Sequence, residues 1–115
     1  MKLEILKLLT ESYSVIKDPK NWCQKSNSVN ESGETVDVCD NNAAKWCSFG
    51  ILMKKYSDMI SSGEIDSLVL VDAERLLSAA CRDISGHEYY FMYNDKNEHT
   101  EVMKMWNLAI DKARS

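Results

Sequence analysis

The sequence predicts a mainly α-helical, single domain over residues 1–115, a compact four-helix arrangement around a central helix at 41–60. Apolar residues recur at steps of three and four in four separate segments, which is the periodicity of amphipathic helices. A chain of 115 residues with 44% hydrophobic and 28% charged residues also fits one domain with its own core. One long polar loop at 20–40 completes this plan, and the sequence allows a short two-stranded β ribbon.

The sequence also predicts the first, third and last helices. The first is expected at 3–17 and ends ahead of Pro19, because proline disfavours helical geometry in the residue before it. The third runs from Asp72 to the "SGH" stop, whereas 68–71 can be helix or strand. The last is expected at 98–114 after an Asn97 cap. Its predicted buried face consists of Val102, Met105, Trp106, Ala109, Ile110 and Ala113.

The central helix at 41–60 is predicted because apolar residues cover most of its circumference. Asp40 or Asn41 would cap it. Gly50 lies in its interior, where glycine costs about 1 kcal/mol relative to alanine, and therefore suggests a close crossing with another helix. This placement also puts Cys47 in the middle of a buried helix.

The aromatic run at 89–93 favours an extended segment, which would pair with 35–38. Alternate residues of a strand face opposite sides, so Tyr90 and Met92 would share one face and the other three aromatics the opposite face. An exposed Tyr90 and Met92 would suit a protein interface, although a tyrosine on a surface needs no partner.

The charge balance limits the classes of partner. A formal charge of −4 and a pI near 5.1 argue against direct binding to nucleic acid, which requires clustered basic residues. Glu31, Glu34, Asp37 and Asp40 follow one another without an intervening basic residue and would either meet a basic protein surface or solvate a loop. The sequence shows neither a signal peptide nor a membrane span, so we expect a cytoplasmic protein.

The cysteines and the polar cluster at 94–99 are the candidates for chemistry. Cys47, His99, Asn94 and Asp95 are the residue types of a thiol-dependent hydrolase or transferase, although a buried cysteine is a poor nucleophile. Cysteine spacing excludes a typical structural zinc site, and no cofactor is predicted. Cys23 and Cys39 could pair in an oxidising compartment.

The polar cluster itself has two interpretations. Turn formation and helix capping explain these residue types without a ligand. Alternatively, Asn94, Asp95 and His99 belong to a small polar pocket walled by Trp22, Trp46 and Tyr93.

The order of four sequence features resembles a small family of uncharacterised bacterial and bacteriophage proteins. These features are Trp22, Gly33, "AAKWCSFGIL" and "YNDKNEHTEVMKMWNLAI". The resemblance covers most of the chain through a loose motif, Trp, a glycine-containing loop, Ala-x-x-Trp-Cys-x-x-Gly-x-Leu and Asn-Asp. It implies an independent helical domain in an accessory or phage-related context, and it implies no activity.

Together these observations favour a non-enzymatic domain that binds a protein partner, with a phage-related inhibitor or accessory factor as the concrete form. The expected binding residues are Trp22, Glu31, Glu34, Asp37, Tyr90, Met92, Asn94, Asp95 and His99. The alternatives are the thiol enzyme and a small-ligand sensor. The sequence indicates no oligomeric state.

Overall fold

The computed structural model describes residues 2–115, which form five α-helices, one 3-10 helix and two short strands. The mainly helical class and the two-stranded ribbon are confirmed. The elements in chain order are α1 (Lys2–Ile16), η1 (Pro19–Asn21), β1 (Ser28–Val29), β2 (Lys45–Trp46), α2 (Ser48–Ser61), α3 (Leu68–Ser85), α4 (Tyr90–Lys96) and α5 (His99–Arg114).

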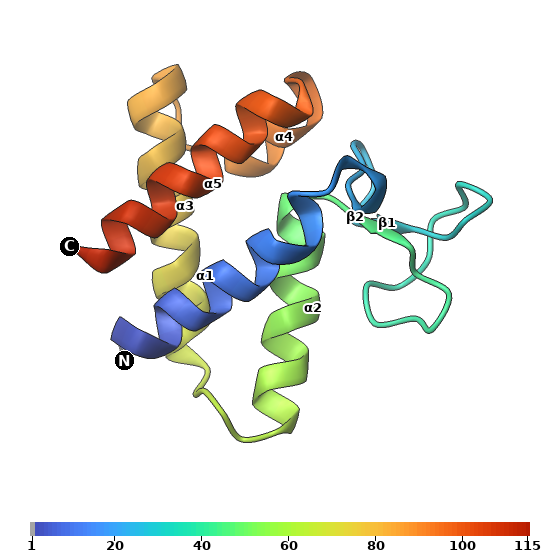
Figure 1. Ribbon diagram of the computed structural model, residues 1–115, viewed down its shortest axis with the longest axis horizontal. Helices are drawn as coiled ribbons and strands as arrows, with labels where there is room; N and C mark the ends of the chain where they lie inside the picture. The colour runs from blue at the N-terminus through green and yellow to red at the C-terminus, as the bar shows by residue number, and fades with distance from the viewer. Residues whose placement is uncertain (1) are drawn as a thin grey trace.

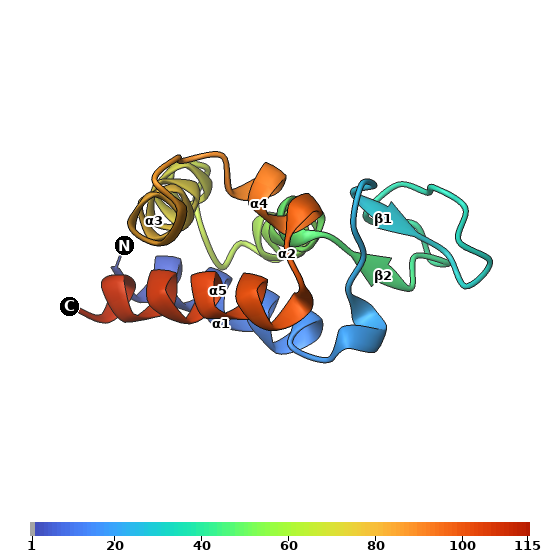
Figure 2. The ribbon, with the colours of Figure 1, turned by 90° about the horizontal axis from the view of Figure 1, so that it is seen from above.

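The helices form two layers. α1 and α5 run antiparallel in one layer, and α2, α3 and α4 lie in the other (Figures 1 and 2). The strands and the long loop lie at one end of the molecule, and both termini lie at the opposite end (Figure 1). The predicted arrangement around the second helix is not what the structure shows, because α1 packs on α2, α3 and α5, whereas α2 packs mainly on α1 and α4.

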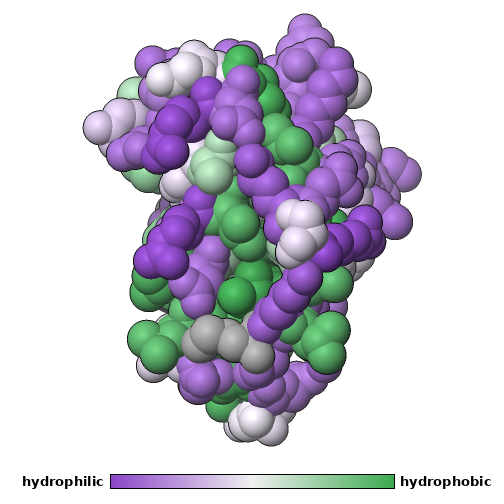
Figure 3. All heavy atoms as spheres, turned by 90° about the vertical axis from the view of Figure 1, so that its left-hand side faces the viewer, coloured by the Kyte–Doolittle hydropathy of each residue, from purple (hydrophilic) through white to green (hydrophobic). Residues whose placement is uncertain are grey.

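The hydrophobic core lies between the layers and is supplied by all five helices. All six residues of the predicted buried face of α5 are buried. Trp106, at its centre, has no exposed surface. At the end where the termini lie, hydrophobic residues form a band flanked by hydrophilic ones (Figure 3).

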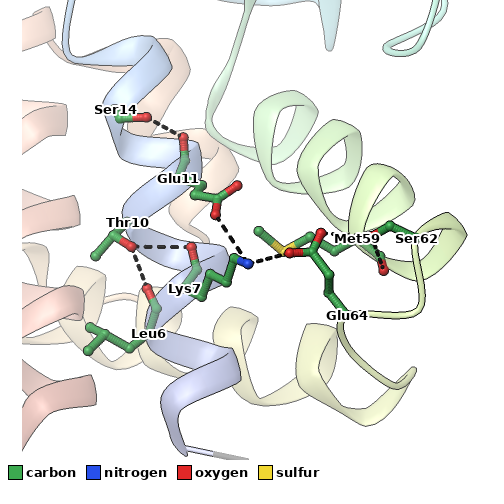
Figure 4. Close-up of polar contacts among 8 residues, drawn as sticks. All are labelled: Leu6, Lys7, Thr10, Glu11, Ser14, Met59, Ser62 and Glu64. Atoms are coloured by element: carbon green, nitrogen blue, oxygen red, sulfur yellow. Dashed lines mark hydrogen bonds and ion pairs between the residues drawn. The ribbon is translucent and has the colours of Figure 1, made fainter.

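An ion-pair network joins α1 to the loop after α2. Lys7 pairs with Glu64 and lies 3.8 Å from Glu11, while the Ser62 hydroxyl donates a 2.7 Å hydrogen bond to Glu64 (Figure 4). These side chains are largely exposed, so the network contributes little to stability.

The second predicted helix begins later than expected. Residues 41–44 are loop, Lys45 and Trp46 form β2, and α2 starts only at Ser48. Asp40 does not cap this helix, because its carboxylate accepts the Asn42 N–H within a turn at 2.7 Å. The apolar residues before Ser48 have helical spacing, but Ala43 and Ala44 lie in the loop, Trp46 in β2 and Cys47 at the helix cap.

α3 resolves the ambiguity at 68–71 in favour of helix. It begins at Leu68, whose N–H is bound at 2.9 Å by the Asp66 carboxylate, and it ends at Gly86 in the left-handed region with φ of 85°. The side chains at its start favour a strand, but the Asp66 carboxylate accepts the first free N–H of the helix, and the segment is helical.

The predicted strand at 89–93 is wrong, because Tyr90–Lys96 is the helix α4. One face of α4 is buried and consists of Tyr90, Tyr93 and Asn94. Phe91 and Met92 lie on the exposed face. The ribbon instead joins β1 to β2, with Ser28 opposite Trp46, and Thr35 forms an antiparallel bridge with Val29.

Candidate functional site

Residues 22–28, here called the arch, cross over the start of α2 and organise this end of the molecule. Trp46 lies between the two ends of the arch. It forms a parallel bridge with Trp22 at one end and pairs antiparallel with Ser28 at the other. The Cys23 N–H donates to the Trp46 carbonyl at 3.1 Å, and the Cys47 N–H donates to the Asn27 carbonyl at 3.1 Å. The two Trp-Cys pairs of the sequence therefore lie side by side.

Gly50 makes the crossing sterically feasible. A Cβ atom at this position would lie 1.8 Å from the Asn27 carbonyl oxygen, far inside van der Waals contact. The expected close crossing with another helix is thus wrong, since the neighbour of Gly50 is the backbone of the arch.

Asn94 is the polar centre of the site and is fully buried. Its Oδ1 accepts hydrogen bonds from Trp22 Nε1 at 2.8 Å, from the Ser48 N–H at 3.0 Å and from Ser48 Oγ at 2.8 Å. Its Nδ2 donates to the Cys23 carbonyl at 3.2 Å. Trp106 Nε1 in turn donates to Ser48 Oγ at 2.9 Å, so the network continues into the core.

Asp95 binds the arch at Lys25. Its carboxylate accepts the Lys25 N–H at 2.8 Å and a bond from Asn94 Nδ2 at 3.1 Å. Lys25 has a φ of 69°, the only positive value among the non-glycine residues described. Left-handed geometry is costly for a side chain that bears a Cβ, and the bond to Asp95 helps to hold Lys25 in it.

His99 stands in the first turn of α5, as expected, but its imidazole is engaged. Nε2 lies 2.7 Å from the Ile16 carbonyl oxygen and must donate to it, since a carbonyl only accepts. The ring also contacts Trp22 edge-on at a centroid distance of 5.3 Å. His99 therefore ties α5 to the end of α1.

Cys47 is the N-cap of α2 and does not lie within the helix. Its sulfur accepts the Gly50 N–H at 3.3 Å and lies 3.9 Å from Asn27 Oδ1 beneath the arch. Burial raises the pKa of this thiol and outweighs the opposing effect of the Gly50 and Phe49 N–H groups. Cys47 is thus held as the neutral thiol, and no hydrogen bond among the described residues joins it to His99.

Cys23 is half-buried inside the arch, where its sulfur lies 3.5 Å from the Ser26 carbonyl oxygen. Burial, with smaller contributions from Cys47 and Asp95, raises the pKa of the Cys23 thiol to about 12. A thiol with this pKa is almost entirely protonated at neutral pH and is a poor nucleophile.

Two hollows flank Lys25 and Asp95, which line both of them. The larger has a volume of about 600 Å³ and is walled by Phe49 and Phe91. It shares Asn27, Thr35 and Phe49 with a smaller hollow along Val36–Val38 and Met53. We call these two adjoining hollows the groove. The second hollow, of about 470 Å³, is the polar one that contains Trp22 and His99.

The predicted polar pocket is therefore assembled differently. Trp22, Asp95 and His99 do meet at the second hollow. Tyr93 does not line it because it packs in the core, and Trp46 does not because its indole N–H donates to the Val38 carbonyl at 2.9 Å. Asn94 lies beneath the surface as a structural group.

The outer face of α4 carries exposed hydrophobic side chains next to the groove: Tyr89 at its cap, Phe91 and Met92 are 52%, 47% and 40% exposed. Tyr90, which was expected to be exposed, is buried, and its hydroxyl donates to Glu74 at 2.5 Å. Burial, followed by the bond to Glu74, raises the pKa of Tyr90.

The acidic run divides between different surfaces. Asp37 lines the groove and also accepts the Cys39 N–H at 2.9 Å. Glu31 lies beside Lys20 and Lys45 in a separate hollow. Glu34 is exposed and accepts a bond from Asn30 at 3.2 Å. These carboxylates thus do not form one patch.

The sequence interpretation missed Lys25, Asn27, Ser48 and Phe49. Lys25, Asn27 and Ser48 owe their roles to backbone geometry and to contacts over long sequence distances, which no local pattern records. Within residues 2–115, no group of three or more His, Cys, Asp or Glu side chains could hold a metal ion, and no helix is long and apolar enough to cross a membrane.

Comparisons of the chain with known protein families, with curated proteins and with solved structures find no match.

Proposed function

We propose that this chain is a non-enzymatic protein-binding domain and that the groove, together with the outer face of α4, is its contact surface. The observation that carries this proposal is the position of Phe91, which is 47% exposed and forms a wall of the groove opposite the arch. Aromatic and methionine side chains beside a concave surface are the usual composition of an interaction hot spot.

The groove also constrains the partner. Phe49 and Phe91 offer an apolar wall, while the Asp95 and Asp37 carboxylates lie along its length and Lys25 lies at the arch. A partner segment with one apolar anchor and a neighbouring basic group would satisfy both features. The narrower form of the proposal, a phage-related inhibitor or accessory factor acting on a host protein, rests on the sequence resemblance alone.

The test compares two pairs of exposed substitutions. The double variant Phe91→Ser, Met92→Ser alters the proposed surface. The control Leu68→Ser, Val71→Ser removes side chains of comparable exposure, 61% and 51%, from α3, which lies apart from the strands and the arch (Figure 1). Each protein is used to capture binders from host lysate, and the affinity of a recovered binder is then measured by titration calorimetry.

We expect the Phe91 and Met92 pair to weaken binding at least tenfold and the α3 pair to leave it unchanged. The opposite pattern would place the interface on α3 and overturn the proposed surface. Circular dichroism of both variants verifies that each retains the helical fold.

The thiol enzyme is the competing class, and iodoacetamide labelling at neutral pH separates it from the binding protein. Because Cys47 is buried and held as a neutral thiol, we expect the exposed Cys39 to react first and Cys47 to remain unlabelled. Rapid labelling confined to Cys47 would favour the enzyme.

A small-ligand sensor is the second candidate, and the volume of the groove favours it. The main hollow, about 600 Å³, falls within the range of small-molecule sites and has aromatic walls. A ligand that binds there raises the melting temperature by mass action. Phe49→Ala should abolish that rise, and a rise that survives the substitution would place the ligand elsewhere.

A further inference from the structure

We propose that Cys23 and Cys47 form a disulfide bond within the chain when a peroxide oxidises them. The starting observation is the register between the two Trp-Cys pairs. Trp22 and Trp46 form a parallel bridge, and the next residue on each chain is a cysteine. Residues in register on neighbouring parallel strands place their side chains on the same side of the strands.

The hydrogen bonds extend this register to the cysteines. The Cys23 N–H donates to the Trp46 carbonyl at 3.1 Å, which holds the Cys23 backbone against the peptide that leads into Cys47. Neighbouring strands are about 4.8 Å apart, and a disulfide accepts Cα separations of about 4.4–6.8 Å. The backbone spacing therefore suits the bond.

Both sulfurs also lie against the same part of the arch. Cys23 Sγ contacts the Ser26 carbonyl at 3.5 Å, and Cys47 Sγ lies 3.9 Å from Asn27 Oδ1. Ser26 and Asn27 are neighbours on the same turn. Each thiol is also influenced electrostatically by Asp95, and Cys23 by Cys47 itself, as expected of two groups in one small compartment.

The other two cysteines are placed differently. Cys39 is exposed in the loop after Val38, and its N–H donates to the Asp37 carboxylate at 2.9 Å. Cys81 is buried on α3, where its sulfur lies 3.5 Å from Ser85 Oγ. The structure thus favours Cys47 over Cys39 as the partner of Cys23.

The chemistry balances with one equivalent of hydrogen peroxide. The small fraction of Cys23 that has released its proton to solvent attacks a peroxide oxygen, the O–O bond breaks, and Cys23 becomes a sulfenic acid, while the leaving hydroxide takes a proton back from solvent and is released as one water. Cys47 then attacks the Cys23 sulfur, the S–O bond breaks, and the hydroxyl leaves as a second water. The two thiols lose two electrons and two protons in total.

The test uses the intact chain carrying Cys39→Ser, which removes the exposed competitor. The protein is treated with hydrogen peroxide, unfolded, alkylated with N-ethylmaleimide and digested with trypsin without reduction. We expect the peptide 21–25 to be joined to the peptide 46–54, lighter than their sum by two hydrogen atoms. Because the pKa of Cys23 is about 12, the rate should rise about tenfold for each pH unit between pH 7 and 9.

A second measurement tests the effect of the bond on thermal stability. The oxidised Cys39→Ser protein should melt at a higher temperature than the reduced form, because the bond restricts the unfolded chain. The same treatment should have no effect when Cys23→Ser is added. Recovery of Cys23 as a sulfinic acid with Cys47 alkylated, a bond to Cys81, or a lower melting temperature after oxidation would each overturn the pairing.

Discussion

Asn94 is the residue on which the arch, α2 and α4 converge. One side-chain oxygen satisfies three donors, and the Trp22 indole and the Ser48 amide are both among them. Buried or half-buried donors of this kind cost free energy when they lose their acceptor. The sequence identified Asn94 as part of a polar cluster, but it could not show burial, because the donors are 46 and 72 positions away in the chain.

Asn94→Ala should therefore destabilise the protein by about 2–4 kcal/mol, as measured by urea unfolding. The matched control is Asn97→Ala, which loses a single 3.0 Å bond to the Tyr93 carbonyl at a less buried position and should cost about 1 kcal/mol or less. Equal losses for the two variants would contradict the role of Asn94 as the polar centre.

Cys23 makes the stability depend on pH in the alkaline range. Its pKa rises from an ordinary value of 9.0 to about 12 on folding, chiefly through burial. The folded state then keeps a proton that the unfolded chain releases, so the contribution of the thiol is complete below pH 9 and is lost between pH 9 and 12. Between pH 9 and 11, the free energy of unfolding should fall less steeply for Cys23→Ala than for the wild type.

At the scale of elements, the start of α2 depends on Gly50. Alanine normally favours a helix by about 1 kcal/mol over glycine, so Gly50→Ala would stabilise an ordinary helix. Here the added Cβ would lie 1.8 Å from the Asn27 carbonyl oxygen, and we expect a loss of about 1–3 kcal/mol in thermal or urea unfolding. Ser57→Ala, in the same helix, is the control and should change stability by less than about 0.5 kcal/mol. If Gly50→Ala stabilised the protein, the backbone of the arch would not be in close contact with α2 at this position.

The helices differ in how well the sequence predicts them, and the reason is physical. α1 and α5 have one apolar face against the core, so periodicity identifies them, and the buried face of α5 follows from spacing alone. α4 is short and dense in aromatic residues, which favours strand locally, and its helix depends on burying Tyr90 and Tyr93. The start of α2 is set by the arch, a contact over a long sequence distance.

At the scale of the whole molecule, the arch and the helical layers form one hydrogen-bonded unit. The chain of bonds runs from Trp22 through Asn94 and Ser48 to Trp106 in the core. An opening of the arch alone would break the bond from Trp22 Nε1 to Asn94 Oδ1 and the bond from Asn94 Nδ2 to the Cys23 carbonyl. The arch and the core should therefore unfold together.

Equilibrium unfolding tests this coupling, because the tryptophans report on both parts. Trp22 and Trp46 belong to the arch region, and Trp106 is in the core, whereas far-ultraviolet circular dichroism follows the helices. In the wild type, tryptophan fluorescence and circular dichroism should give coincident urea transitions, as two-state unfolding requires. Asn94→Ala breaks the link, so its fluorescence transition should begin at lower urea than the loss of helix. A wild-type fluorescence change that precedes the loss of helix would show that the arch opens independently of the core.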